Sequence, residues 1–160
     1  MRLRQGCRGA WIALLAALSD RLTKLAVSRF APEGRLLIPG VINLRPVENR
    51  GMAFSMLSGQ SLALTLVTAA LIAALLLWLI LRPDAPRLFR TGFWLIVGGG
   101  LGNLYDRVTA GGVSDFIELA FVRFAVFNVA DVCICVGAAL VLIETARSDL
   151  PKGGKSDNTD

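Results

Sequence analysis

The chain has 160 residues, of which 54% are hydrophobic and only 18% are charged, and its mean hydropathy is +0.60. Soluble domains carry about 25% charged residues, so this composition favours a small membrane protein and excludes disorder for most of the chain. Histidine is absent, which excludes Ser-His and Cys-His catalytic pairs and histidine-based zinc sites. The three cysteines are too few and too scattered for a disulfide framework.

Four segments are apolar enough to cross a membrane, at about residues 9–28, 61–81, 90–106 and 124–143. A spanning helix needs about 20 mostly apolar residues. The second segment has no charge after residue 61, and the fourth is interrupted only by Asp131. The first follows a basic start, as a signal peptide does, but no cleavage site follows it and the helical pattern continues. We therefore expect an uncleaved first span and four transmembrane helices.

Two outer regions are expected, at about residues 29–60 and 107–123. In the first, short strands near 36–38 and 41–44 flank a Pro39-Gly40 turn, and the second is a loop that bends at Gly111 and Gly112. The sequence thus predicts a mainly α membrane protein with a small extramembrane β-sheet and loop region. Residues 1–147 would form one membrane domain, and the polar segment 148–160 a disordered cytoplasmic tail.

The distribution of basic residues predicts the orientation. Segments 1–8, 82–90 and 144–160 contain nine of the 17 Lys and Arg residues, a much higher density than in the rest of the chain. Because short cytoplasmic segments are enriched in Lys and Arg, we expect both termini in the cytoplasm. The same topology explains the net charge of +5 without a nucleic-acid partner.

Three of the predicted spans carry a polar residue at a similar depth. Asp20, Asn103 and Asp131 each lie twelve or thirteen residues, about 18 to 20 Å, from the charged inner end of their helix. Each also has polar neighbours at helical spacing, including Lys24 four residues after Asp20. These residues could simply be polar contacts that hold the helices together. Their convergence instead predicts one site near the outer membrane surface, because charges inside a membrane usually serve function.

Carboxylates are the reactive groups available in such a site. Two carboxyls that share one proton can hydrolyse a peptide bond, because the ionised group accepts a proton from water while the protonated group donates one to the carbonyl oxygen. Asp131 is one candidate, and Asp106 and Asp115 are the candidates for its partner. A metal site would need more carboxylates, so none is expected.

Five short motifs resemble those of the bacterial lipoprotein signal peptidases, also called signal peptidase II. In chain order they span residues 20–24 (DRLTK), 49–55 (NRGMAFS), 102–107 (GNLYDR), 112–117 (GVSDFI) and 127–131 (FNVAD). The family often has Gln where Arg21 stands, which is a departure at a position outside the catalytic pair. Each motif alone is weak, but five in this order across four spans are highly specific.

The resemblance implies an inner-membrane aspartic endopeptidase that removes the signal peptide from diacylglyceryl-modified prolipoproteins, cleaving before the lipidated cysteine. By motif match, Asp115 and Asp131 would be the catalytic pair, near the periplasmic face. The residues expected to line or support the site are Asp20, Lys24, Asn49, Gly51, Asn103, Arg107, Asn128 and Ala130. Membrane lipids and globomycin-type cyclic peptides would be further partners, and no cofactor is implied.

The local sequence also favours Asp115 over Asp106 as the partner of Asp131. Asp106 stands next to Arg107, which we expect to neutralise it. Asp115 has apolar neighbours and follows the glycine bend, which suits a loop folded back toward the start of the fourth span.

Three rival functions are less consistent with the sequence. A small proton-coupled transporter or channel using Asp20 and Asp131 would need polar residues along its whole path, yet the inner half of every span is apolar. A presenilin-like protease would need its Tyr-Asp and Gly-x-Gly-Asp motifs in the opposite order. A lipid-binding scaffold would not need a second carboxylate near Asp131.

Overall fold

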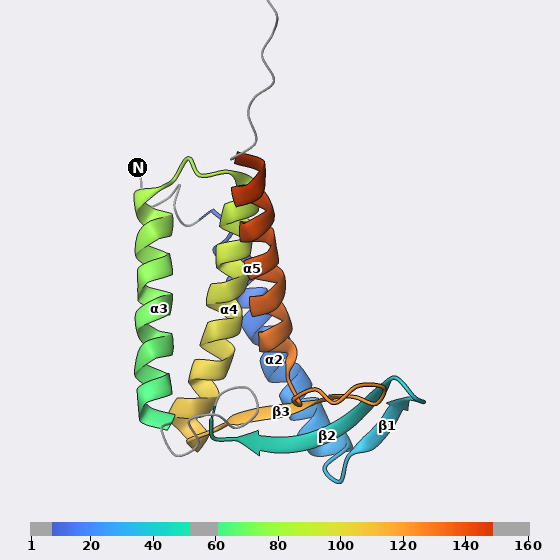
Figure 1. The fold of residues 1–160 in the computed structure, drawn as a ribbon. Coiled ribbons are helices and arrows are strands. Elements are labelled where there is room, and N and C mark those ends of the chain that lie inside the picture. Colours follow the sequence, from blue (N-terminus) through green and yellow to red (C-terminus); the bar gives the residue numbers. More distant parts are fainter. Residues whose placement is uncertain (1–7, 52–60, 149–160) are drawn as a thin grey trace, which may run out of the picture.

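A computed structural model describes residues 8–51 and 61–148 of the chain. Four long helices lie side by side, and a small sheet extends sideways from one end of them (Figure 1). The elements in chain order are α2 (Ala10–Phe30), β1 (Arg35–Ile38), β2 (Ile42–Asn49), α3 (Ser61–Leu81), α4 (Arg87–Ala110), β3 (Val113–Leu119) and α5 (Val129–Ser148). Cys7, residues 52–55 of the second motif and the tail from residue 149 onward lie outside the described residues.

Helix α4 is central and contacts the other three helices. Its glycines allow this close packing, because a Cβ at Gly98 would stand only 2.5 Å from the carbonyl oxygen of Ala13 on α2. A Cβ at Gly99 would collide in the same way with the backbone of Ala130 on α5. Gly98 thus lets α2 pack closely against α4, and Gly99 does the same for α5. Small residues allow such close contacts between membrane helices.

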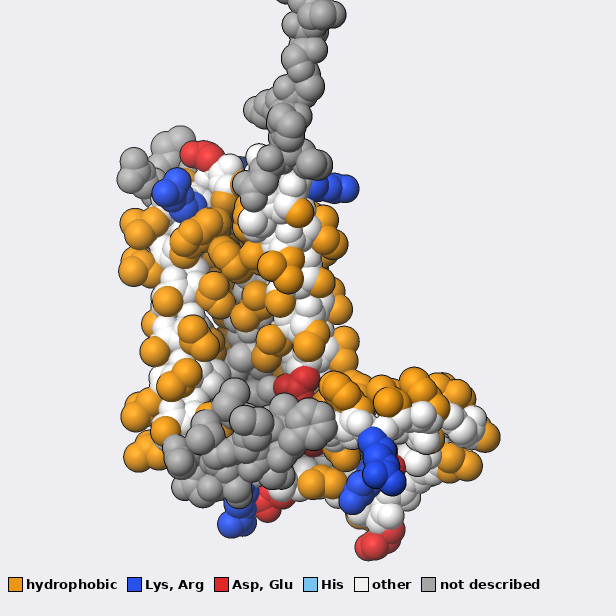
Figure 2. All heavy atoms as spheres, viewed as in Figure 1, with side chains coloured by type: hydrophobic (Ala, Val, Ile, Leu, Met, Phe, Trp, Pro, Cys, Tyr) orange, Lys and Arg blue, Asp and Glu red, His pale blue; other side chains and the backbone are white. Residues whose placement is uncertain are grey.

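Within the described residues, α3 and α5 are the helices that are both long and apolar enough to cross a membrane. Their outward surfaces are apolar, and Figure 2 shows hydrophobic side chains covering the sides of the helix bundle. Helices α2 and α4 are also long enough to cross, at 21 and 24 residues, but they carry more charged side chains. The four-span count therefore stays a prediction for these two helices.

The sheet has the order β1-β2-β3 and is antiparallel throughout. The predicted hairpin around Pro39 and Gly40 is confirmed as the β1–β2 connection. The third strand was not predicted, because residues 107–123 were expected to form a loop. Residues 113–119 instead pair with β2, and the register places Asp115 opposite Val47.

Two helix ends also differ from the expected bounds. Helix α4 continues to Ala110 and is capped by Gly111, whose φ of 78° places it in the left-handed region that favours glycine. Arg107 therefore lies on the helix and not on the outer loop. Helix α5 begins at Val129. Residues 124–128 were predicted to be helical but are not, because Phe127 pairs with Ile117 of β3.

Candidate active site

The polar residues of the first, third and fourth helices meet one face of the sheet at a single place. Helix α2 contributes Asp20 and Lys24, and α4 contributes Asn103, Asp106 and Arg107. Asn128 and Asp131 stand at the start of α5. Asn49 ends β2, and Asp115 lies in the middle of β3.

Lys24 is the buried centre of this group, with a side chain only 3% exposed. Its ammonium group lies 2.7 Å from Asp20 Oδ2, 2.8 Å from Asp106 Oδ2 and 3.3 Å from Asn103 Oδ1. All three ammonium protons therefore have an acceptor, which is the condition for burying a charge at tolerable cost. The expected pair of Asp20 and Lys24 is present.

The prediction that Arg107 neutralises the Asp106 carboxylate is wrong. Asp106 pairs with Lys24, and more distantly with Arg21 at 3.8 Å, instead of with Arg107. Its Oδ2 also accepts a hydrogen bond of 3.2 Å from the backbone N–H of Ser114, the residue that precedes Asp115. Asp106 thus connects the end of α4 to the start of β3.

The start of α5 is fixed by three side-chain hydrogen bonds. The backbone N–H of Ala130 donates to Asp20 Oδ1 at 3.0 Å, so α2 satisfies one of the free N–H groups at this helix end. Asn128 Oδ1 accepts from the N–H of Asp131 at 2.9 Å, and Asp131 Oδ2 accepts from the N–H of Asn128 at 3.1 Å. This reciprocal arrangement is a capping box, so Asn128 caps the helix from the position just before its first residue.

The Asn128 amide joins the two candidate carboxylates. Its Nδ2 donates to Asp115 Oδ1 at 2.7 Å and to Asn103 Oδ1 at 3.1 Å. Asn103 Nδ2 in turn donates to Asp131 Oδ1 at 2.8 Å. Asn128 is completely buried, and it bonds the Asp115 carboxylate through its side-chain amide and the Asp131 carboxylate through its backbone N–H, so it fixes the two carboxylates relative to each other.

Asp115 is held from the sheet side as well. Asn49 Nδ2 donates to Asp115 Oδ2 at 2.9 Å, and Asn49 Oδ1 accepts from the backbone N–H of Gly51 at 3.0 Å. Burial raises the pKa of Asp115 to about 6, the hydrogen bond from Asn49 opposes this rise, and the charge of Asp131 adds to it. Asp115 therefore keeps a proton at a higher pH than an ordinary aspartate does.

A cavity of about 520 Å³ opens onto both carboxylates. At its polar end it is lined by Asn49, Gly51, Asn103, Arg107, Asp115 and Asp131. The rest of its wall is largely apolar and comes from Leu119, from residues 124–127 and from the face of α5 that includes Val132 and Cys135. Such a cavity can place a peptide group against the carboxylates while it encloses an apolar chain beside them.

The structure therefore brings together every residue that the sequence predicted for the site. Asp20, Lys24 and Ala130 lie behind the cavity wall, and the others line it or bridge its carboxylates. The sequence predicted a structural ion pair for Asp106 but not its partner Lys24, and it did not predict the apolar wall formed by Leu119 and residues 124–127. A signal for the helix cap was present, since Asn-x-x-Asp directly precedes an apolar run, but nothing local indicated the contact between Lys24 and Asp106. Among the described residues, no group of three or more acidic or cysteine side chains is placed to hold a metal ion.

Comparisons with known proteins agree with this architecture. Residues 12–147 match the family model described as signal peptidase (SPase) II. The chain is 39% identical over 142 residues to a lipoprotein signal peptidase of Gloeobacter violaceus, covering 87% of this chain and 82% of that one. It is 36% identical over 143 residues to the Streptococcus pneumoniae protein of the same name, covering 88% and 94%.

Solved structures show the same fold. One bacterial membrane enzyme, solved by the in meso method at 2.3 Å resolution, superposes with a TM-score of 0.84 at 26% identity, covering 96% of this chain and 94% of that one. A second, solved at 1.9 Å resolution, gives a TM-score of 0.78 at 27% identity, covering 86% and 92%. With a family model over most of its length and relatives well above 30% identity, the chain belongs to the signal peptidase II family.

Proposed function

We propose that this protein is an aspartic endopeptidase that removes the signal peptide from prolipoproteins, cleaving before a cysteine that carries a diacylglyceryl group. The observation that carries this proposal is the pair Asp115 and Asp131, joined through Asn128 at the polar end of a largely apolar cavity. The family supplies the substrate class, and the geometry of this pair supplies the chemistry.

In the proposed reaction, Asp115 carries the shared proton and Asp131 is ionised. Water attacks the carbonyl carbon of the scissile peptide, Asp131 accepts a proton from that water, and Asp115 gives its proton to the carbonyl oxygen. The resulting tetrahedral diol then collapses. Asp131 returns its proton to the leaving nitrogen, the C–N bond breaks, and Asp115 regains its proton from a hydroxyl of the diol. The raised pKa of Asp115 supports this assignment of the proton.

The same proposal places all four helices across the bacterial inner membrane, with both termini in the cytoplasm and residues 1–147 as the peptidase domain. The carboxylates then lie near the periplasmic face, since they stand at the end of the bundle from which the sheet extends. The apolar wall of the cavity would hold the acyl chains of the substrate. Globomycin-type cyclic peptides would compete for the same space, and no metal or cofactor takes part.

The test is cleavage by purified protein. A fluorogenic signal peptide with a diacylglyceryl-cysteine should be cut, and mass spectrometry should find the lipidated cysteine at the new N-terminus. The same peptide without lipid should be cut at least tenfold more slowly, because it leaves the apolar wall of the cavity empty. Equal cleavage of both peptides, or a product cut elsewhere, would contradict the proposed substrate.

A further inference from the structure

A groove of about 600 Å³ lies between α2 and α4 and is separate from the active-site cavity. The two share no lining residue. On α4, Leu101 and Tyr105 line the groove, whereas Asn103 and Arg107 line the active-site cavity. Because residues two apart on a helix point about 200° away from each other, the groove and the cavity lie on opposite sides of α4.

The groove is apolar over most of its length and polar at one end. Its apolar part is formed by Leu14 and Leu18 of α2 and by Leu101 of α4. Arg21 and Tyr105 stand at the polar end, with the guanidinium carbon 4.8 Å from the centre of the tyrosine ring. This order of apolar and cationic groups matches a phospholipid, whose acyl chains follow an anionic headgroup.

The depth of the groove also matches one leaflet of the membrane. Gly111 caps the outer end of α4 and accepts a hydrogen bond of 2.7 Å from Ser61, the first residue of the apolar helix α3. At 1.5 Å per residue, Tyr105 lies about 9 Å and Leu101 about 15 Å from Gly111 along α4. Half of a bilayer core is about 15 Å thick, so the groove lies in the outer half, with Arg21 toward the surface.

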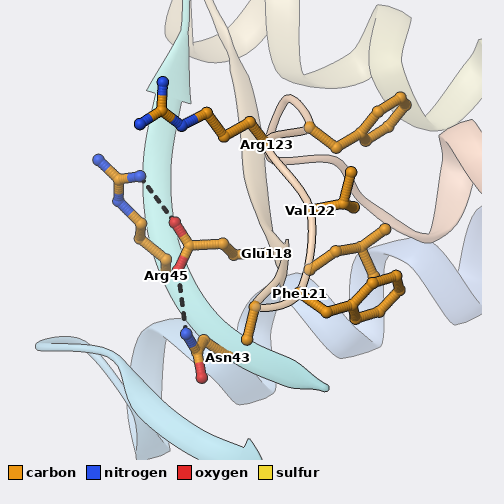
Figure 3. Close-up of a pocket in the computed structure, with 9 residues that line it drawn as sticks. Asn43, Arg45, Glu118, Phe121, Val122 and Arg123 are labelled. Atoms are coloured by element: carbon orange, nitrogen blue, oxygen red, sulfur yellow. Dashed lines mark hydrogen bonds and ion pairs between the residues drawn. The ribbon is translucent and has the colours of Figure 1, made fainter. Parts of the chain in front are cut away.

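Arg21 has hydrogen-bond donors to spare. Its Nη1 lies 3.8 Å from Asp106 Oδ1, which is longer than a hydrogen bond, and its side chain is 45% exposed. Arg45 of the sheet, by contrast, donates to Glu118 Oε1 at 2.8 Å (Figure 3). Because donors without acceptors are costly near hydrocarbon, the guanidinium group of Arg21 requires an acceptor from outside the described chain.

We propose that this groove binds one anionic phospholipid of the outer leaflet, with the phosphate on Arg21 and an acyl chain along the leucines. A guanidinium group can bind two phosphate oxygens through parallel N–H bonds. The nearby carboxylates of Asp20 and Asp106 are already bound to Lys24. The ammonium group of a zwitterionic lipid would therefore find no free carboxylate beside Arg21 among the described residues, which favours an anionic headgroup.

A lipid in the groove covers the back of the buried ion cluster. Asp20 and Gly102 form the floor of the groove, and a Cβ at Gly102 would stand only 2.6 Å from Asp20 Oδ2. Asp20 in turn bonds Lys24 and the N–H of Ala130 at the start of α5. The acyl chain thus shields from water the residues that position this end of α5. The inference rests on the membrane placement in the proposed function and not on its reaction.

The experiment measures lipid binding to the full chain by native mass spectrometry after release from detergent micelles. Phosphatidylglycerol and phosphatidylcholine with identical acyl chains are the probes. Arg21→Gln removes the cation of the groove, and its matched control, Arg45→Gln, removes an exposed cation of the sheet. Ala17→Phe fills the apolar part of the groove, and its control, Ala70→Phe, adds the same ring to the exposed face of α3. A cooperative melting transition shows that a variant is folded, and if Arg21→Gln or Ala17→Phe fails this check, the other decides.

The parent protein should bind its first phosphatidylglycerol more tightly than its first phosphatidylcholine by about threefold or more, as one solvent-accessible ion pair allows. Arg21→Gln should lose this preference and Arg45→Gln should keep it. Ala17→Phe should weaken the first binding event of both lipids, and Ala70→Phe should not.

Equal affinities in the parent, a preference that survives Arg21→Gln, or undiminished binding by Ala17→Phe would overturn the proposal. Cleavage of the lipidated peptide by the parent tests the proposed function separately. Lipid binding as expected without cleavage would refute that function and leave the groove proposal standing, whereas cleavage without a lipid preference would overturn the groove proposal alone.

Discussion

Replacing Lys24 by Met tests whether the buried ion cluster holds the helices together. Methionine keeps the length and the apolar stem of the side chain but removes the ammonium group. Asp20 and Asp106, which are 1% and 4% exposed, then lose the cation that lies 2.7 and 2.8 Å from their carboxylates. Removing one partner from a buried ion pair costs about 3–5 kcal/mol, because the remaining charge is left without compensation.

A loss of that size should lower the melting temperature by roughly 10 °C or more, measured by tryptophan fluorescence in detergent. Arg50→Met is the matched control, since it breaks an exposed pair with Glu48 and should change stability by no more than about 1 kcal/mol. Adding Asp20→Asn and Asp106→Asn to Lys24→Met removes the uncompensated charges and should restore much of the loss. The reasoning is refuted if Lys24→Met alone is as stable as the parent protein, or if neutralising both carboxylates restores nothing.

Three further predictions concern the site. Because the pKa of Asp115 is raised to about 6, its proton is lost as the pH rises through that value, and kcat/KM should fall on the alkaline side with an apparent pKa near 6; a profile without that limb would contradict the assignment. Asp106→Asn should keep measurable turnover and lose about 1.5–3 kcal/mol of stability, seen as a lower melting temperature, because it weakens bonds to Lys24 and Ser114. Exhaustive chelation should leave turnover unchanged, and activity that disappears and returns with a divalent ion would exclude the two-carboxylate mechanism.

The long-range features of the site could be predicted from the sequence only where they depend on helix geometry. Asp20, Asn103 and Asp131 could be placed at one depth because a helix has a fixed rise per residue. The structure joins the three elements at that depth, with Asn103 bonded to Asp131 and Asp20 bonded to the start of α5.

Contacts between segments far apart in sequence could not be predicted in this way. Strand β3 was missed because its partner, β2, lies more than 60 residues earlier, and the sequence around Ser114 and Asp115 alternates too weakly to indicate a strand. The pairing of Asp106 was misassigned because sequence proximity favoured Arg107, whereas packing of α2 against α4 brought Lys24 within 2.8 Å. The Asn-x-x-Asp spacing from Asn128 to Asp131 is typical of a helix cap. It was not recognised because the fourth helix was expected to begin at about residue 124.

The most direct test of the account compares three Asp-to-Asn variants in the cleavage assay with the lipidated peptide. Asp115→Asn and Asp131→Asn should each abolish cleavage, while both proteins stay folded and still bind a globomycin-type cyclic peptide. Asp106→Asn, a buried aspartate on the same network but outside the cavity wall, should retain turnover. A folded Asp106→Asn protein without activity, alongside an Asp115→Asn protein that still cleaves, would show that the catalytic pair is wrongly assigned.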